Sequence, residues 1–85
     1  MKFTYSFPAS KRAKERTLNE QVTILREEAV EVYRACMDWD EGKMLAAVMG
    51  VVFAAEGVLR KYPKNQIEAA YEFTGTWAQD AGEFD

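Results

Sequence analysis

The sequence contains no histidine, one cysteine and two prolines. Without an imidazole, the chain can build neither a histidine-activated serine or cysteine nucleophile nor a zinc site that uses histidine. The single cysteine, Cys36, cannot form a disulfide within the chain, and its place in an apolar pattern predicts a buried side chain. Any metal ion would have to be a hard cation held by oxygen atoms.

Long apolar runs are also missing, and we expect no secretion leader. The longest apolar stretch, residues 44–55, is shorter than the roughly 18 residues that cross a bilayer. The first residues do not combine a basic start with an apolar run. We therefore expect a soluble, cytoplasmic protein with no membrane partner.

The chain is short and its charge is uneven. A single domain of 85 residues buries only roughly 60 to 65% of its surface, so we expect a homo-oligomer, a dimer or tetramer. Residues 1–19 carry five basic groups and one acid, so with a net charge of −3 the rest of the chain totals −7. The basic segment 11–16 is either a solvated helix start that docks on acids or a patch that binds phosphate. The acidic body argues against duplex nucleic acid as a partner.

Apolar residues recur at helical spacing along most of the chain. Thr17 and Glu20 form a capping box that opens a helix over 17–37, after a weaker turn from Ser10. A turn over 38–42 leads to a second helix over 43–61, and Asn65 with Glu68 predicts a cap that opens a third. The predicted core positions are Leu18, Val22, Leu25, Ala29, Val32 and Cys36, then Leu45, Val48, Val52, Ala55 and Leu59, then Ile67, Ala70 or Tyr71, Thr74, and Trp77 or Ala78.

These helices predict an all-α fold: an antiparallel helical hairpin plus a third helix, because the connection between the two long helices is short. Phe3, Tyr5 and Phe7 alternate with polar residues, which predicts a short extended segment at the N-terminus. The predicted organisation is a basic and aromatic arm over 1–16, a helical domain over 17–78 and an acidic tail over 79–85.

Two features of the long helices point beyond the core. The second helix carries a stripe of small residues, which predicts either a tight helix contact or the border of a ligand cavity. This stripe consists of Ala47, Gly50, Ala54 and Gly57. The first helix carries three acids beside its apolar stripe, Glu27, Glu28 and Glu31, whose mutual repulsion calls for a compensating metal ion or basic side chain.

The residues around these acids resemble the MazG-like branch of the all-α nucleoside triphosphate pyrophosphohydrolases, most of all the short phage and mobile-element versions. The resemblance covers roughly residues 16–65 and rests on Leu18-Asn19-Glu20-Gln21, Leu25-Arg26-Glu27-Glu28-Ala29-Val30-Glu31-Val32, Val51-Val52-Phe53-Ala54-Ala55-Glu56 and Leu59-Arg60. It implies a helical bundle completed by oligomerisation. It also implies that Glu27, Glu28 and Glu31 stand where the family holds Mg²⁺, which in turn holds a triphosphate during hydrolysis to a monophosphate and pyrophosphate.

The second acidic motif of that family, Glu-x-x-Asp, falls on Ala47 and Gly50, so both of its acids are missing. We therefore expect no resident cofactor, and Mg²⁺ only if some hydrolysis persists. The leading interpretation is a degenerate MazG-like protein that binds a nucleotide or similar phosphate ligand without hydrolysing it. The predicted phosphate-binding residues are Lys11, Arg12, Arg16, Arg60 and Lys61. The alternatives are a phage-type module that acts on a host protein and a pyrophosphohydrolase with residual activity.

Overall fold

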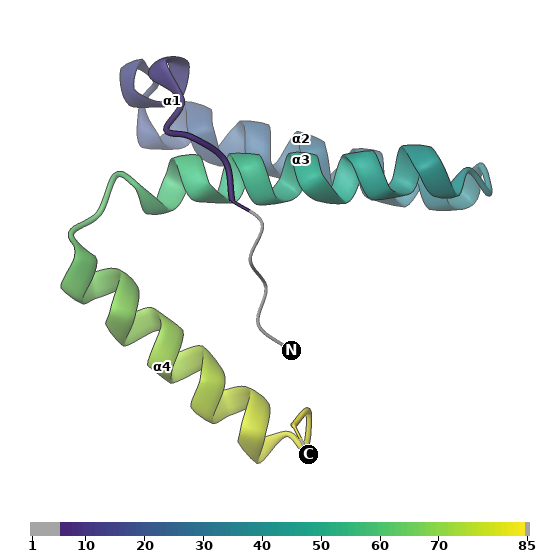
Figure 1. The fold of residues 1–85 in the computed structure, drawn as a ribbon. Helices are drawn as coiled ribbons and strands as arrows, with labels where there is room; N and C mark the ends of the chain where they lie inside the picture. The colour runs from purple at the N-terminus through teal and green to yellow at the C-terminus, as the bar shows by residue number, and fades with distance from the viewer. Residues whose placement is uncertain (1–5, 85) are drawn as a thin grey trace.

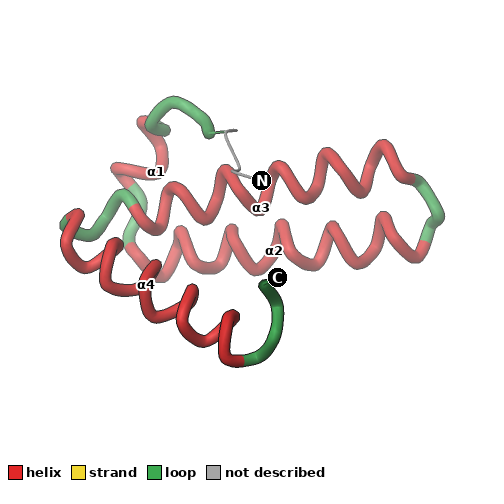
Figure 2. Tube along the Cα trace, turned by 60° about the horizontal axis from the view of Figure 1, so that its bottom comes forward, coloured by secondary structure: helices red, strands yellow, loops and turns green. Residues whose placement is uncertain are grey.

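The computed structural model describes residues 6–84, and in this range all the regular secondary structure is helical. The helices are α1 (Lys11–Glu15), α2 (Leu18–Met37), α3 (Glu41–Leu59) and α4 (Lys64–Asp80). Helices α2 and α3 lie side by side as an antiparallel hairpin, with α1 at the end opposite the turn (Figures 1 and 2). The predicted all-α class, with a hairpin and a further helix, is confirmed.

Two predicted helix starts are present and one is wrong. The Thr17 hydroxyl accepts the N–H of Glu20 at 3.2 Å, and the Glu20 carboxylate accepts the N–H of Thr17 at 2.9 Å. Upstream, the Ser10 hydroxyl caps α1 by accepting the N–H of Ala13 at 3.1 Å. The cap predicted at Asn65 is not formed, because α4 begins earlier, with Pro63 as its N-cap and no side-chain hydrogen bond.

A tight turn reverses the chain between α2 and α3. The N–H of Asp40 donates to the carbonyl of Ala35, and the N–H of Trp39 donates to that of Cys36, which is a Schellman motif. Trp39 accordingly adopts a left-handed backbone conformation, with φ of 56°. The Asp40 carboxylate then caps α3 by accepting the N–H of Lys43 at 3.0 Å. Helix α3 therefore returns directly along α2.

The stripe of small residues on α3 faces α2. Ala54 is completely buried, and Gln21 of α2 is 1% exposed beside it. The Gln21 side-chain nitrogen donates to the Ala54 carbonyl at 3.2 Å, and its oxygen accepts from Arg16 at 3.3 Å, so both buried polar atoms have a partner. Gly57 and Gly50 lie under the side chains of Gln21 and Glu28, respectively, and leave them room that a larger residue would take.

The apolar stripes predicted as core stay largely open in the single chain. Leu18, Val22, Leu45, Val48 and Leu59 are 40 to 62% exposed, and Cys36 is exposed as well, so its predicted burial is wrong. The reason is geometric: small residues let two helix backbones approach closely, so the small stripe of α3 takes the contact with α2. The stripe of larger residues on α3 therefore faces away from α2 and stays largely exposed.

Helix α4 leaves the end of α3 at a wide angle and diverges from the hairpin (Figure 1). Of the alternatives predicted to face inward, Tyr71 and Trp77 are 80 and 62% exposed, whereas Ala78, the alternative to Trp77, is buried. Residues 6–10 form a loop that leads to α1, whereas most of the segment predicted as extended lies outside the described residues.

Helix α3 is apolar over most of its length, with Glu41, Lys43 and Glu56 as its charged residues. Its 19 residues include an 18-residue window with a mean hydropathy of 1.6, which meets the length and composition of a membrane span. The sequence-based expectation, drawn from the shorter run 44–55, missed this. A helix at the centre of a protein core has the same length and composition, and no other described helix does.

Candidate functional site

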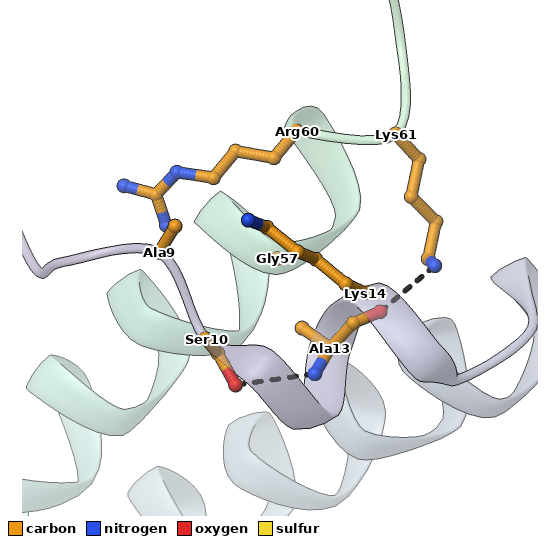
Figure 3. Close-up of a pocket in the computed structure, with 7 residues that line it drawn as sticks. All are labelled: Ala9, Ser10, Ala13, Lys14, Gly57, Arg60 and Lys61. Carbon is orange, nitrogen blue, oxygen red and sulfur yellow. Dashed lines mark hydrogen bonds between the residues drawn. The ribbon is translucent and has the colours of Figure 1, made fainter.

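A cavity of about 240 Å³ opens where α1 crosses the C-terminal end of α3 (Figure 3). Three basic side chains line it: Lys14 from α1, and Arg60 and Lys61 from the end of α3. The remaining lining residues are small: Ala9, Ser10, Ala13 and Gly57. The cavity is therefore a small space with cationic walls, formed by two segments that lie more than 40 positions apart in the sequence.

Helix α1 is held against α3 by a close backbone approach and by Lys61. At Gly57, an added Cβ would lie 3.2 Å from the Cβ of Ala13, which is tighter than ordinary contact, so glycine favours the close approach of α1. The Lys61 ammonium donates to the carbonyl of Ala13 at 2.9 Å and to that of Arg16 at 2.6 Å. These carbonyls lie at the end of α1, where a cation is favoured by the helix dipole.

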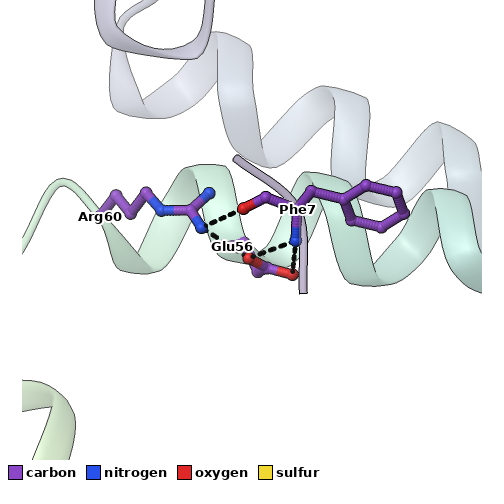
Figure 4. Close-up of polar contacts among 3 residues, drawn as sticks. All are labelled: Phe7, Glu56 and Arg60. Atoms are coloured by element: carbon purple, nitrogen blue, oxygen red, sulfur yellow. Dashed lines mark hydrogen bonds and ion pairs between the residues drawn. The ribbon is translucent and has the colours of Figure 1, made fainter. Parts of the chain in front are cut away.

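Arg60 is held by a second set of contacts (Figure 4). Its Nη2 donates to the Phe7 carbonyl and to Glu56 Oε2, both at 2.7 Å, and the Phe7 N–H donates to the Glu56 carboxylate at 3.3 Å. The Phe7 ring meets the Phe53 ring edge-on, with centroids 5.3 Å apart. These contacts hold the loop before α1 along α3. They also occupy the Nη2 group of Arg60.

The cavity keeps an excess of positive charge after these pairings. Glu56 is paired with Arg60 at 2.7 Å, whereas within residues 6–84 neither Lys14 nor Lys61 forms an ion pair. The Lys61 ammonium has three N–H groups and donates two of them to backbone carbonyls, so one donor remains for a ligand. The arrangement can hold a compact anion such as a phosphate group.

The predicted phosphate ligands are only partly brought together. Arg60 and Lys61 line the cavity, whereas Lys11 and Arg12 are exposed residues of α1 that do not. Arg16 instead donates to the Gln21 side-chain oxygen at 3.3 Å and so supports the hairpin contact.

Lys14 is the lining residue that the sequence-based list missed. A usable signal was present, because Ala13 and Lys14 come three and four residues after the capping Ser10, so they flank the side of the short helix on which Ser10 lies. Ala13 is buried against α3, so the adjacent Lys14 has to emerge at the rim of that contact.

The three predicted metal ligands do not converge. Glu28 is half-buried and lies against Gly50, where an added Cβ would be 3.1 Å from its carboxyl carbon. Glu31 is exposed and pairs with Arg34 at 2.8 Å; it lines one depression with Glu27 on α2 and a second one with Ala47 of α3. In the part of the chain that the structure describes, no three acidic or cysteine side chains lie close enough to hold one metal ion.

This donor set does not fit the Mg²⁺ that the MazG-like resemblance implies. Magnesium sites need several oxygen ligands in near-octahedral order, and here the helix facing Glu28 offers a glycine backbone instead of carboxylates. The compensating cation for Glu31 is Arg34, one helical turn away. No step of phosphoryl chemistry is therefore assigned to these three glutamates.

Comparison with protein-family models, curated protein sequences and solved structures returned no match to this chain. The MazG-like resemblance stays a prediction that rests on the residues quoted for it.

Proposed function

We propose that this protein binds a phosphate-bearing ligand, with a nucleotide as the leading candidate, in the cavity between α1 and α3. The observation that carries this proposal is the placement of Lys14, Arg60 and Lys61 around one small space. Charge-assisted hydrogen bonds from such cations to phosphate oxygens are among the stronger polar contacts in proteins, worth about 1.5–3 kcal/mol each.

The size of the cavity supports a phosphate group more than a whole nucleotide. At about 240 Å³ it lies below the roughly 300–1,000 Å³ of pockets that enclose drug-sized ligands. A phosphate or pyrophosphate group would fill it, and the rest of a nucleotide would lie outside. We therefore expect affinity to depend on the phosphates and little on the base.

We further propose that the ligand is bound without hydrolysis, as in a MazG-like protein whose metal site has been lost. Support comes from the position of Glu28 against Gly50 and from the pairing of Glu31 with Arg34. Incubation with each NTP and dNTP plus Mg²⁺ or Mn²⁺ tests this directly, by detection of released pyrophosphate. Turnover that disappears in Glu28→Gln would overturn it in favour of a residually active pyrophosphohydrolase.

The binding test uses two lysines of the same short helix. Lys14→Glu places a negative charge at the cavity, whereas Lys11→Glu makes the same change of net charge on a residue that does not line it. In calorimetric titrations with pyrophosphate and with ATP, Lys14→Glu should weaken binding about tenfold or more, and Lys11→Glu about threefold or less. Equal losses in the two variants, or no binding by the native protein, would contradict the proposed site.

A second candidate function is the capture of another protein, such as a host protein, through α4. The observation that favours it is the exposure of three aromatic residues on a helix that packs little on its own chain: Tyr71, Phe73 and Trp77. Capture of one defined protein from a cell extract should then be lost in a Tyr71→Ser and Phe73→Ser double variant. Capture that survives these changes would count against α4 as the binding surface.

A further inference from the structure

The chain exposes far more surface than a compact protein of its size. Its accessible surface is 7356 Å², whereas a folded monomer of 9.7 kDa exposes about 5,100 Å². Its radius of gyration is 14.6 Å, against about 12 Å for a compact domain of this length. A standard protein interface removes about 800 Å² from each partner, so the excess is ample for one.

The uncovered surface includes a regular seam along the side of α3 away from α2. The seam residues alternate spacings of three and four, which is the pattern of a coiled-coil contact line. They are Leu45, Val48, Val52, Ala55 and Leu59. Leu45, Val48 and Leu59 are 62, 40 and 46% exposed, whereas Val52 and Ala55 between them are half-buried. The small-residue stripe of α3 is covered by α2, and the seam lies on the other side of the helix. An apolar side of a helix is stable in water only when it is covered.

Helix α4 begins beside the C-terminal end of the seam. Where α3 and α4 diverge, Leu59 at the end of the seam lines an apolar pocket with Tyr62, Ile67 and Ala70. The two helices splay apart beyond this point (Figure 1). The seam of α3 is therefore left open in the single chain, beside a helix that has its own exposed aromatic residues.

The charges at the two ends of α3 have opposite signs. Asp38, Asp40 and Glu41 surround its N-terminal end, and Arg60, Lys61 and Lys64 follow its C-terminal end. If two seams met in parallel, acids would face acids and bases would face bases. An antiparallel meeting places each acidic end beside the basic end of the other copy, so it is favoured electrostatically.

We propose that the seam of α3 is the dimer interface of this protein, and that a second copy of the chain occupies it in antiparallel orientation. Each copy then covers the apolar side of α3 that its own α2 leaves exposed. In this arrangement Glu41 of one copy approaches the basic end of α3 in the other. The seam itself is separate from the phosphate site, because no seam residue lines that cavity, although Arg60 and Lys61 at the basic end of α3 do.

Two valines of equal exposure provide the first test. Val48 in the seam is 40% exposed in the single chain and Val30 on α2 is 39% exposed, so Val48→Glu and Val30→Glu are matched changes. Light scattering coupled to size exclusion should give the native protein twice the chain mass of 9.7 kDa. Val48→Glu should weaken dimerisation at least a hundredfold, and Val30→Glu should leave the dimer intact. A monomeric native protein, or equal effects of the two variants, would overturn the proposal.

Orientation is tested by charge exchange and by cross-linking, which also cover the case in which Val48→Glu does not fold. Glu41→Lys and Lys64→Glu should each weaken the dimer about tenfold at low salt, and an equimolar mixture of the two should restore it. With Cys36→Ser as background, the double variant Glu41→Cys and Lys64→Cys should form a disulfide-linked dimer on oxidation. Glu41→Cys alone should not. Cross-linking by Glu41→Cys alone, or a mixture no tighter than the separate variants, would contradict the antiparallel arrangement.

Discussion

The Gln21 side chain of α2 lies directly over Gly57 of α3. An added Cβ at Gly57 would lie 2.5 Å from the Gln21 side-chain nitrogen, and that nitrogen also donates to the Ala54 carbonyl. The long buried side chain of one helix thus fills the space that the missing side chain of the other leaves. This fit fixes how α3 lies on α2 and, through Ala13, how α1 lies on α3.

Two glycines in helices should respond oppositely to alanine. Gly57→Ala should destabilise the protein by about 1–3 kcal/mol, because the new methyl group displaces Gln21 and its buried hydrogen bond. Gly75→Ala should stabilise it by about 0.5–1 kcal/mol, because nothing lies within 4 Å and alanine is the better helix former. Urea unfolding of the two variants checks both signs. Similar effects at the two positions would contradict the described packing.

Trp39 occupies a position that favours glycine. Its φ of 56° is strained for a side chain with a Cβ, and the residue is 92% exposed, so little burial offsets the strain. Trp39→Gly should therefore raise the free energy of unfolding by about 1 kcal/mol. Trp39→Ala keeps a Cβ and should bring no such gain. The measurement is urea unfolding at one fixed protein concentration, and a loss of stability in Trp39→Gly would show that the ring makes a stabilising contact elsewhere.

The capping box at Thr17 makes stability depend on pH. Hydrogen bonds from Thr17, first of all from its backbone N–H, hold the pKa of Glu20 below its ordinary value of 4.5. Because the folded state binds the proton less tightly, this contribution is fully present above pH 4.5 and is lost as the pH falls through the lowered pKa. Glu20→Gln should flatten this part of the acid unfolding curve. A curve identical to that of the native protein would exclude Glu20 as its source.

The MazG-like resemblance can be tested by restoring the missing acids. Gly50→Asp places a carboxylate against Glu28, whose half-buried side chain has to move aside, and Ala47→Glu places another in the cavity that Ala47 lines with Glu31. If the alignment is right, the variant should gain Mg²⁺ affinity and be stabilised by about 1.4 kcal/mol at a tenfold excess of Mg²⁺ over its dissociation constant. Adding Glu28→Gln to the same variant should remove the gain. No response to Mg²⁺ would count against the resemblance.

Local features of the helices were predictable from the sequence because they depend on neighbouring residues. The capping box at Thr17 and the cap at Ser10 were found this way, since each involves residues three positions apart. The cap predicted at Asn65 was wrong, because the helix begins after Pro63. The local sequence is compatible with a helix start at either residue.

The composition of the cavity was only partly predictable, because its cations lie more than 40 positions apart in the chain. The basic segment and the end of the second helix could each be recognised as possible phosphate ligands. Which of their side chains meet depends on the angle at which α1 crosses α3, and that angle follows from Gly57 and from the capping of α1 by Lys61. Lys14 therefore replaced Lys11, Arg12 and Arg16 at the cavity.

The sequence alone determined that this chain forms helices, where the hairpin turns, and that α3 carries two stripes, one of small residues and one of large ones. Only the tertiary structure decided that the small stripe meets α2 and the large one stays uncovered. The physical reason is that both stripes have helical spacing, so periodicity cannot rank them. Close approach of two backbones, with Gln21 and Glu28 lying over Gly57 and Gly50, selects the small stripe.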